Sequence, residues 1–313
     1  MERTSYKLHF APLQGFTDSF FRNTFDKHFG GVDTYYTPFI RIDKGTFLHR
    51  DLRGIEPDAN TVGCLLPQIL PGSPEEFRKL TELLISLEYK HIDINLGCPF
   101  PLIAGKHKGA GMLPYPDEVK AVLETINEYP ETDFSLKMRL GWENPDECLI
   151  LADILNSIRL RHITLHARTG KQQYKGETDK DAFARFYERC IHPLFYNGDL
   201  KTTEEIEEIL TCFPRLEGVA LGRGLLASPL LAKEFKGHKM IPESDRTALY
   251  AVFHRELFHY YSEKLQGTTQ LLMKMKTLWE YFLPETDRKL LKKIKKANKI
   301  EQYTEAVHEI FKE

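Results

Sequence analysis

The sequence lacks several features that would place it in a specialised class of protein. Its five cysteines include no C-x-x-C pair, which argues against both a disulfide framework and a zinc site, and no metal is expected. No apolar stretch is long enough for a membrane span. The opening MERTSYKLHFAPLQ shows no charged segment followed by an apolar one, so no signal peptide is predicted. These absences favour a soluble protein of a reducing compartment, and we expect it in the cytoplasm.

An excess of charge of one sign is also lacking. The chain has 43 Lys and Arg against 45 Asp and Glu, a formal net charge of −2, which excludes a uniformly basic nucleic-acid binder but not a basic patch. Basic residues gather instead in RKLLKKIKKANK (288–299), which contains no acidic residue. Such a run is typical of a solvated helix face, and it also suits a contact with an RNA backbone.

Short apolar runs alternate with Gly/Pro/Asn-rich breaks and helical segments through the first three quarters of the chain. Eight such alternations predict parallel βα units, and eight units favour closure into a (β/α)8 barrel, the TIM barrel. A doubly wound open sheet is the alternative, but no G-x-G-x-x-G follows the first strand. The predicted strands are 8–11, 33–37, 64–70, 91–95, 133–138, 162–167, 193–197 and 217–221, with helices at 74–88, 116–129, 146–159, 179–190 and 202–212.

The alternation stops near residue 240. From residue 244 the pattern is helical throughout, with predicted helices at 244–266, 268–283 and 285–313 and a break at Pro284. The expected organisation is a barrel over residues 1–239 followed by an all-helical domain over residues 240–313.

Polar residues and glycines follow almost every predicted strand. The carboxyl ends of the strands of a barrel meet at one face, which is where active sites of such barrels lie. Each group could be ordinary turn chemistry, but their coincidence at one face predicts a functional site. The groups are Pro12-Leu13-Gln14, Gln68, Asn95 with Cys98, Lys137 with Arg139, His166 with Arg168, Asn197-Gly198-Asp199 and Gly222-Arg223-Gly224.

The last two groups favour a phosphate site. Loops after the seventh and eighth strands of such barrels commonly bind phosphate through backbone N–H groups. Here the segments 197–199 and 222–224 supply glycine for close approach and Arg223 for charge. The alternative is a pair of tight turns. A phosphorylated ligand or cofactor is therefore expected.

Lys137 and His166 have more than one interpretation. An ammonium group in a barrel mouth needs a partner, and the edge of a flavin ring that becomes anionic on reduction would supply one. A Schiff-base lysine is the rival role. His166 could donate to the same flavin edge, or it could be a core histidine.

Cys98 ends the segment INLGCP on a rigid turn, Pro99-Phe100-Pro101, ahead of a glycine-rich loop that we expect to be mobile. The thiol could be structural, a nucleophile with a lowered pKa, or a general acid that stays protonated at neutral pH. Its predicted place over the barrel mouth argues against a core role and favours the acid.

A series of segments resembles the tRNA-dihydrouridine synthases in order and spacing between residues 11 and 226. The ordered set is specific, above all Cys directly before Pro in N-x-G-C-P, and the helical tail resembles the family's tRNA-binding domain more loosely. The segments are APLQGFTDSFFR (11–22), Gln68, INLGCP (94–99), GAGML (109–113), LKMR (136–139), HARTGKQQYKG (166–176), NGD (197–199) and LGRGLL (221–226).

The resemblance implies an FMN-containing barrel that uses NADPH to reduce the C5=C6 bond of a uridine in tRNA. Hydride from flavin N5 would reach C6 of the uracil, and a proton would reach C5 from the opposite face. Cys98 matches the family's proton donor. The target uridine would have to leave its stack to reach the barrel mouth.

The same matching implies roles for the other residues at the strand ends. Those implied to bind the flavin are Pro12, Leu13 and Gln14 along the ring, Gln68, Lys137 and His166 at the ring or ribityl chain, and Asn197, Gly198, Asp199, Gly222 and Arg223 at the phosphate. Those implied to meet the substrate are Asn95, which would orient the uracil, and Arg139, Arg168 and Tyr174, which would face the RNA.

The sequence departs from the family pattern at two places. Leu13 stands where the family usually has Met, and the loop 100–108 lacks the usual basic pair directly after the Cys-Pro, with Lys106-His107-Lys108 following later. We expect this loop to carry specificity. The uridine reduced stays open, and a monomer is expected. Two rival functions are a flavin-dependent reductase of a free pyrimidine or enone, which would not need the basic tail, and a non-catalytic tRNA-binding protein.

Overall fold

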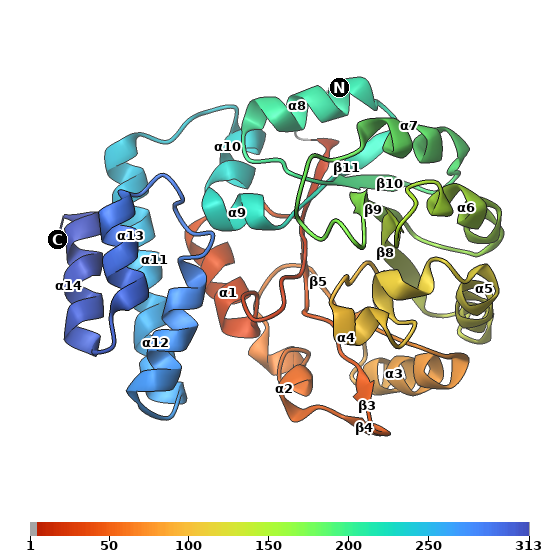
Figure 1. The fold of residues 1–313 in the computed structure, drawn as a ribbon, viewed down its shortest axis with the longest axis horizontal. Helices are drawn as coiled ribbons and strands as arrows, with labels where there is room; N and C mark the ends of the chain where they lie inside the picture. The colour runs from red at the N-terminus through yellow and green to blue at the C-terminus, as the bar shows by residue number, and fades with distance from the viewer. Residues whose placement is uncertain (1–4, 313) are drawn as a thin grey trace.

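The computed structural model describes residues 5–312 and shows a parallel β-barrel surrounded by helices, with a further group of helices at one side (Figure 1). Nine strands form one sheet in the order β5-β2-β1-β11-β10-β9-β8-β7-β6. All pairings in this sheet are parallel, so the predicted barrel is confirmed. The strands are β1 (Lys7–Phe10), β2 (Thr34–Tyr36), β5 (Leu65–Leu66), β6 (Gln68–Ile69), β7 (His91–Leu96), β8 (Asp133–Gly141), β9 (Ile163–Thr169), β10 (Leu194–Asn197) and β11 (Leu216–Leu221).

The third predicted strand, 64–70, is divided in two at Pro67. Its first half, β5, pairs with β2, and its second half, β6, pairs with β7. Proline has no N–H group to donate to a strand ladder, although the Pro67 carbonyl oxygen still accepts from the Asp93 N–H at 2.9 Å. Because only Pro67 separates β5 from β6, the two ends of the strand order meet and the ring closes as eight strands.

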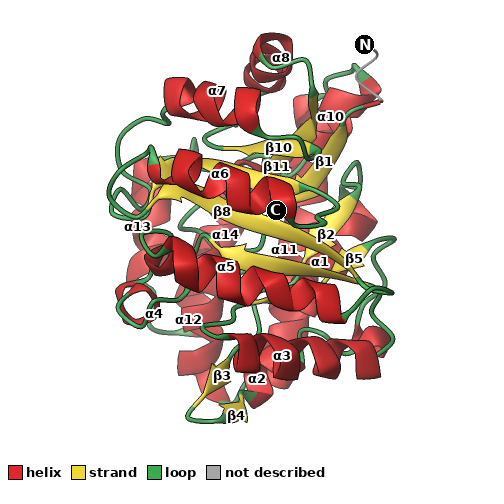
Figure 2. Ribbon diagram, turned by 90° about the vertical axis from the view of Figure 1, so that its right-hand side faces the viewer, coloured by secondary structure: helices red, strands yellow, loops and turns green. Residues whose placement is uncertain are grey.

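Helices connect successive strands and cover the outer face of the barrel (Figure 2). Their first turns show why they begin where they do. The Ser73 side chain accepts from the Glu76 N–H at the start of α3, and Thr202 and Glu205 form a capping box at the start of α8. These helices are α1 (Ser19–His28), α3 (Pro74–Ser86), α5 (Pro116–Glu124), α6 (Glu147–Ser157), α7 (Lys180–Arg189) and α8 (Thr203–Cys212).

Several short elements lie in the connections and were not predicted. The longest insertion follows β2 and contains an antiparallel pair of two-residue strands. The short elements are β3 (Ile42–Asp43), β4 (Thr46–Phe47), α2 (His49–Leu52), η2 (Pro57–Ala59), α4 (Pro101–Ala104), η3 (Gly109–Met112), η4 (Thr125–Glu128), α9 (Arg223–Ala227) and α10 (Leu231–Gly237).

The C-terminal segment forms four helices where three were predicted. These are α11 (Glu243–Lys264), α12 (Gly267–Leu278), α13 (Arg288–Lys296) and α14 (Ile300–Phe311). The expected helix over 285–313 is interrupted at the buried Ala297, which has φ −56° and ψ 128°. Its carbonyl oxygen turns away from the helix axis and accepts from the Lys276 ammonium. The domain division at residues 239 and 240 stays a prediction.

The C-terminal helices pack against the loop that follows β1 and against the first turn of α1. The Phe20 and Tyr260 rings stack with centroids 3.6 Å apart. Asp18, the N-cap of α1, accepts from the Tyr261 hydroxyl and the Lys274 ammonium, each at 2.8 Å. Lys274 also donates to the Gly15 carbonyl oxygen at 2.8 Å. The helices therefore help to hold a loop that reaches the barrel mouth.

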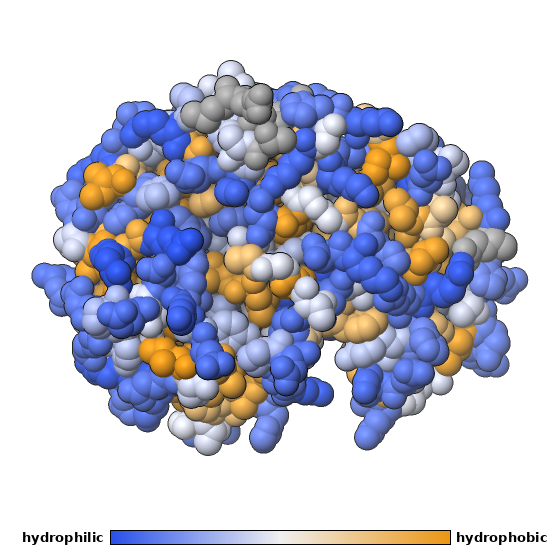
Figure 3. Space-filling view, turned by 180° about the vertical axis from the view of Figure 1, so that it is seen from behind, coloured by the Kyte–Doolittle hydropathy of each residue, from blue (hydrophilic) through white to orange (hydrophobic). Residues whose placement is uncertain are grey.

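None of the helices within residues 5–312 is both long and apolar enough to span a bilayer. On the face shown in Figure 3, hydrophilic residues predominate and apolar residues form small, separated areas.

Candidate active site

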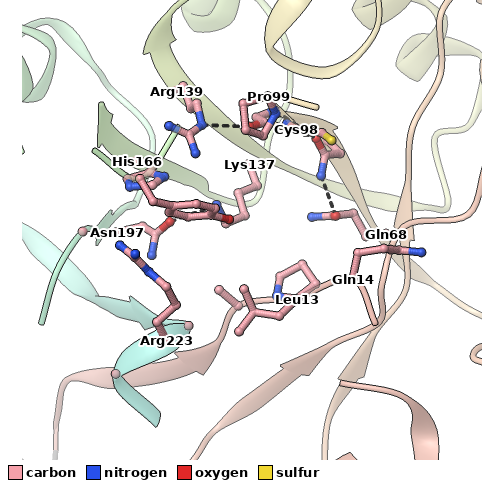
Figure 4. Close-up of a pocket in the computed structure, with 18 of the residues that line it drawn as sticks. Leu13, Gln14, Gln68, Cys98, Pro99, Lys137, Arg139, His166, Asn197 and Arg223 are labelled. Atoms are coloured by element: carbon pink, nitrogen blue, oxygen red, sulfur yellow. Dashed lines mark hydrogen bonds between the residues drawn. The ribbon is translucent and has the colours of Figure 1, made fainter. Parts of the chain in front are cut away.

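A solvent-open cavity of about 150 Å³ lies at the carboxyl ends of the barrel strands. It brings together every residue that the sequence pointed to, except Arg168 (Figure 4). Its lining, which mixes apolar side chains with amide and charged ones, is typical of small-molecule sites. The predicted residues that line it are Pro12, Leu13, Gln14, Gln68, Asn95, Cys98, Lys137, Arg139, His166, Tyr174, Asn197, Gly198, Asp199, Gly222 and Arg223.

Cys98 is held at the edge of this cavity by its own turn. The Asn95 side-chain oxygen accepts from the backbone N–H groups of Gly97 and Cys98, at 2.9 and 2.8 Å. Burial raises the pKa of the Cys98 thiol, and this outweighs the opposing effect of charges such as Arg139 and Arg41. The thiol is therefore protonated at neutral pH, as a proton donor must be and as a thiolate nucleophile is not.

The glycine-rich loop after Cys98 is tightly packed, which differs from the mobility expected from its composition. Gly109, with φ +58°, lies so close to Cys98 that a Cβ would approach the Cys98 Cβ to 2.9 Å. A Cβ on Gly111 would come within 2.2 Å of the Ala104 carbonyl oxygen. Both glycines are buried. Their absence of a side chain permits close packing behind the Cys98 turn.

Lys137 projects from β8 into the cavity, where it donates to the Asn197 side-chain oxygen at 2.9 Å. Burial lowers the pKa of Lys137 to about 8, and the nearby positive charge of Arg139 acts in the same direction. An anionic ring edge placed here would satisfy this ammonium group. The observed donor set thus fits the flavin that the sequence led us to expect.

His166 lines the same cavity from β9, where it is paired in register with Arg139 of β8. Burial holds its pKa well below the usual range, together with the positive charges of Arg139 and Lys137. Its imidazole is therefore neutral at pH 7. The Nε2 atom accepts from the Arg168 guanidinium at 3.4 Å, which leaves the N–H on Nδ1 as the donor.

Arg139 lines the cavity but is only 1% exposed. Its guanidinium donates to the carbonyl oxygens of Gly97 at 2.9 Å, Thr169 at 2.9 Å and Gln173 at 2.8 Å. It thus fastens the Cys98 turn to the loop after β9. The geometry favours a positioning role over the expected role of facing the RNA.

Arg168 lies outside the cavity lining and its side chain is fully buried. It donates to Asp199 and, at 2.6 Å, to the Gly176 carbonyl oxygen. The expectation that Arg168 faces the RNA does not match this placement. Alternation along β9 puts Arg168 on the same face as His166, whose Nε2 accepts from it at 3.4 Å, but its other two acceptors come from later loops that enclose the guanidinium.

The other end of the cavity has the features expected of a phosphate site. The Arg223 guanidinium pairs with the Asp199 carboxylate at 2.6 Å and lies over the Tyr174 ring, 4.3 Å from its centroid. A Cβ on Gly224 would come within 2.0 Å of the Leu200 carbonyl oxygen, so the loops after β10 and β11 approach as only glycine allows. Tyr174 is 43% exposed at the rim.

Sequence reasoning missed the loop after the second strand. Pro38 and Phe39 line the cavity directly after β2. Their position at a strand end was the signal that could have identified them, because each of the other strand ends had been considered.

The basic segment 288–299 forms α13 and the turn after it. Leu290, Leu291 and Ile294 form its inner side and are partly or fully buried. Lys292 and Lys296 are exposed. Lys293 pairs with Glu309 of α14 at 2.6 Å. The helix therefore has an apolar inner side and a basic outer side.

Comparisons with known proteins show the family to which the chain belongs. A family model described as dihydrouridine synthase matches residues 9–313. A tRNA-dihydrouridine synthase B of Pasteurella multocida is 27% identical over 244 residues, covering 78% of this chain and 72% of that protein. A tRNA-dihydrouridine(16) synthase of Haemophilus ducreyi is 30% identical, covering 74% of this chain and 73% of its own length.

Solved structures show that the barrel architecture is shared more widely. Morphinone reductase superposes with a TM-score of 0.53 at 14% identity, covering 80% of this chain and 91% of its own. A variant of NCR from Zymomonas mobilis superposes with a TM-score of 0.51 at 14% identity, covering 76% and 88%. At such low identity the likeness concerns the fold alone.

Proposed function

The chain belongs to the dihydrouridine synthase family, whose activity is the flavin-dependent reduction of tRNA uridine, and from this premise we propose how its own residues carry out that reaction. The flavin is FMN, bound in the barrel mouth, and the reductant is NADPH. The proton donor to the uracil is Cys98. The observation that carries the proposal is the half-buried thiol, held protonated on a fixed turn beside a cavity with a donor-rich floor.

The cavity residues divide between the two ends of FMN. Lys137, His166 and Gln68 offer hydrogen-bond donors to the ring, and Leu13 supplies an apolar wall. The loops 197–199 and 222–224 hold the phosphate, with Arg223 as its cation. When bound, FMN supplies the hydride that reduces C6 of the uracil.

Asn95 and Cys98 act on the uracil. One hydrogen of the Asn95 amide is used within the protein, and the second is available to a carbonyl oxygen of the base. The Cys98 thiol gives its proton to C5 as the C5=C6 bond is reduced, and solvent then returns a proton to the thiolate. A positioned acid of this kind contributes roughly 10²- to 10⁴-fold to rate.

The tRNA contacts lie around the rim and on α13. Phe100 and Leu102, in the loop after Cys98, are 55% and 73% exposed despite being apolar, which suits contact with an unstacked base. Tyr174, in the loop after β9, is exposed at the same opening. The exposed lysines of α13 supply a sequence-independent contact with the RNA backbone.

The test is reduction of an unmodified tRNA transcript by the purified protein with FMN and NADPH, followed by mapping of dihydrouridine by mass spectrometry. We expect dihydrouridine at defined positions, and its loss from tRNA of cells lacking the gene. A protein that binds no flavin would contradict the cofactor. A flavoprotein that reduces free pyrimidines or enones but not tRNA would favour a small-molecule reductase.

A further inference from the structure

A buried carboxylate lies beneath the site, outside the cavity lining. Asp93 is on β7, two residues before Asn95, and is 0% exposed. One of its oxygens accepts from the Gln68 side-chain N–H at 2.7 Å, and the other accepts from the Ser135 hydroxyl at 2.6 Å. A carboxylate this deep is costly to bury, so its interactions need an explanation.

Asp93 begins a chain of hydrogen bonds that ends at Cys98. The Gln68 amide N–H donates to Asp93. The Gln68 amide oxygen accepts from the Asn95 side chain at 2.7 Å, the bond dashed at Gln68 in Figure 4. The Asn95 oxygen in turn accepts from the Cys98 backbone N–H at 2.8 Å. The chain therefore crosses from the barrel interior to the proton donor.

The two ends of this chain decide its direction. An ionised carboxylate can only accept, and a backbone N–H can only donate, whereas each amide between them can turn either way. Only one orientation of the Gln68 and Asn95 amides satisfies both ends. In that orientation the oxygen of Asn95 is committed to the Cys98 turn, and an N–H is left for the base.

We propose that Asp93 is a positioning residue that acts through Gln68 to fix the Asn95 amide and, with it, the Cys98 turn. The proposal rests on the proposed function, in which Cys98 donates the proton and Asn95 orients the uracil. Asp93 itself touches neither the cavity nor the reacting atoms. Ser135 completes the arrangement by holding the second oxygen of Asp93.

Asp93 could instead act only as a charge, because it is also close enough to influence Lys137. Two substitutions separate these roles. Asp93→Asn removes the charge but can still accept from Gln68 and donate to Ser135, so it preserves the direction of the chain. Asp93→Ala removes the charge and the acceptor together.

The readout is the alkylation rate of the Cys98 thiol by iodoacetamide, followed by mass spectrometry of the Cys98 peptide. It is measured in a Cys64→Ser/Cys212→Ser background, because those two cysteines are exposed. We expect Asp93→Ala to raise the rate roughly tenfold, corresponding to loss of one hydrogen bond to a charged acceptor. Asp93→Asn keeps the hydrogen bond from Gln68, so its alkylation rate is expected to stay within about twofold of the parent.

The matched control is Glu234→Gln, which alters another buried carboxylate, paired with Arg246 and remote from the cavity. It should leave the Cys98 rate unchanged even if stability falls. Parental alkylation in a folded Asp93→Ala protein would overturn the proposal, as would an Asp93→Asn rate equal to that of Asp93→Ala. If Asp93→Ala does not fold, Gln68→Leu breaks the same chain one link closer to Cys98, and a parental rate there overturns it.

The alkylation assay uses neither tRNA nor NADPH, and it is run with and without FMN. A failure of the proposed function would appear as absence of dihydrouridine formation by the parent protein. A failure of the positioning role would appear as unchanged thiol reactivity in a parent that reduces tRNA normally. The two results are therefore independent.

Discussion

At the scale of single residues, the chemistry depends on groups whose pKa is shifted by burial. Cys98 keeps its proton, His166 is neutral, and Lys137 has a pKa of about 8. The pKa of a lysine or thiol in contact with water would not be shifted in this way. The cavity therefore presents donors and neutral acids to its ligands rather than fixed charges alone.

Replacing Cys98 by alanine tests the acid directly. We expect Cys98→Ala to retain FMN and its reduction by NADPH, while uridine reduction falls roughly 10²- to 10⁴-fold, the usual contribution of a general acid. Stopped-flow absorbance measures the first step and mass spectrometry of tRNA the second. The control is Cys64→Ala, an exposed cysteine away from the cavity. Near-normal dihydrouridine formation by Cys98→Ala would remove Cys98 from the acid role.

The lowered pKa of Lys137 predicts a pH dependence of stability. In the unfolded chain the lysine keeps its proton to about pH 10.4, whereas in the folded protein it releases it near pH 8. Between these values the unfolded state binds more protons, so the folded state gains stability as pH rises. Without bound flavin, the parent should therefore gain on the order of 2 kcal/mol relative to Lys137→Met across this window.

Urea unfolding of both proteins at several pH values between about 8 and 10 measures this difference. Contributions from other titrating groups cancel in the comparison. A constant difference would show that Lys137 titrates normally.

At the scale of elements, the segment after β7 is defined by how closely it packs. Gly109 and Gly111 place η3 directly behind the Cys98 turn, and the Ala110 N–H donates to the Cys98 carbonyl oxygen at 3.0 Å. The same compactness leaves Phe100 and Leu102 exposed at the rim. The same packed segment therefore fixes the position of Cys98 and carries the exposed Phe100 and Leu102.

A methyl group at Gly111 tests this packing. Gly111→Ala should destabilise the protein by about 1–3 kcal/mol, because the new Cβ overlaps the Ala104 backbone. Urea midpoints measure the loss, and the Cys98 alkylation rate reports displacement of the turn. Gly63→Ala is the matched control, since a Cβ there meets nothing within 4 Å. Equal midpoints for the two variants would show that the loop yields easily.

At the scale of the whole molecule, charge is distributed unevenly over a nearly neutral chain. The C-terminal helices attach to the loop after β1 through Asp18, Tyr261 and Lys274, and α13 carries exposed lysines. A tRNA bound across both parts would meet the cavity and the basic helix together. The attachment fixes the distance between them.

Charge reversal on α13 tests the proposed RNA contact. Lys292→Glu/Lys296→Glu should weaken tRNA binding and reduce the slope of log affinity against log salt by about 1.5, since each phosphate that is no longer neutralised accounts for roughly 0.7–0.9. Filter binding at several salt concentrations gives both values. The control is Lys90→Glu/Lys120→Glu, which reverses two exposed lysines on other parts of the chain. If both pairs behave alike, α13 is an ordinary solvated helix.

Much of this protein was predictable from local sequence. The alternation of apolar runs with helical segments indicated the barrel, and the residues after each strand indicated its mouth, because parallel strands bring their carboxyl ends to one face. The matched segments then identified the family. Local signals sufficed wherever the relevant property was periodicity or position along a strand.

Only the tertiary structure decided which of these residues reach the cavity and which support it. Arg168 is buried against Asp199, the expected last helix is interrupted at Ala297, and the glycines after Cys98 serve close packing. Asp93, which no sequence pattern singled out, is connected to the Cys98 turn by hydrogen bonds through Gln68 and Asn95. The reason is physical: burial, pKa and hydrogen-bond direction depend on partners distant in the chain, and folding alone brings these together.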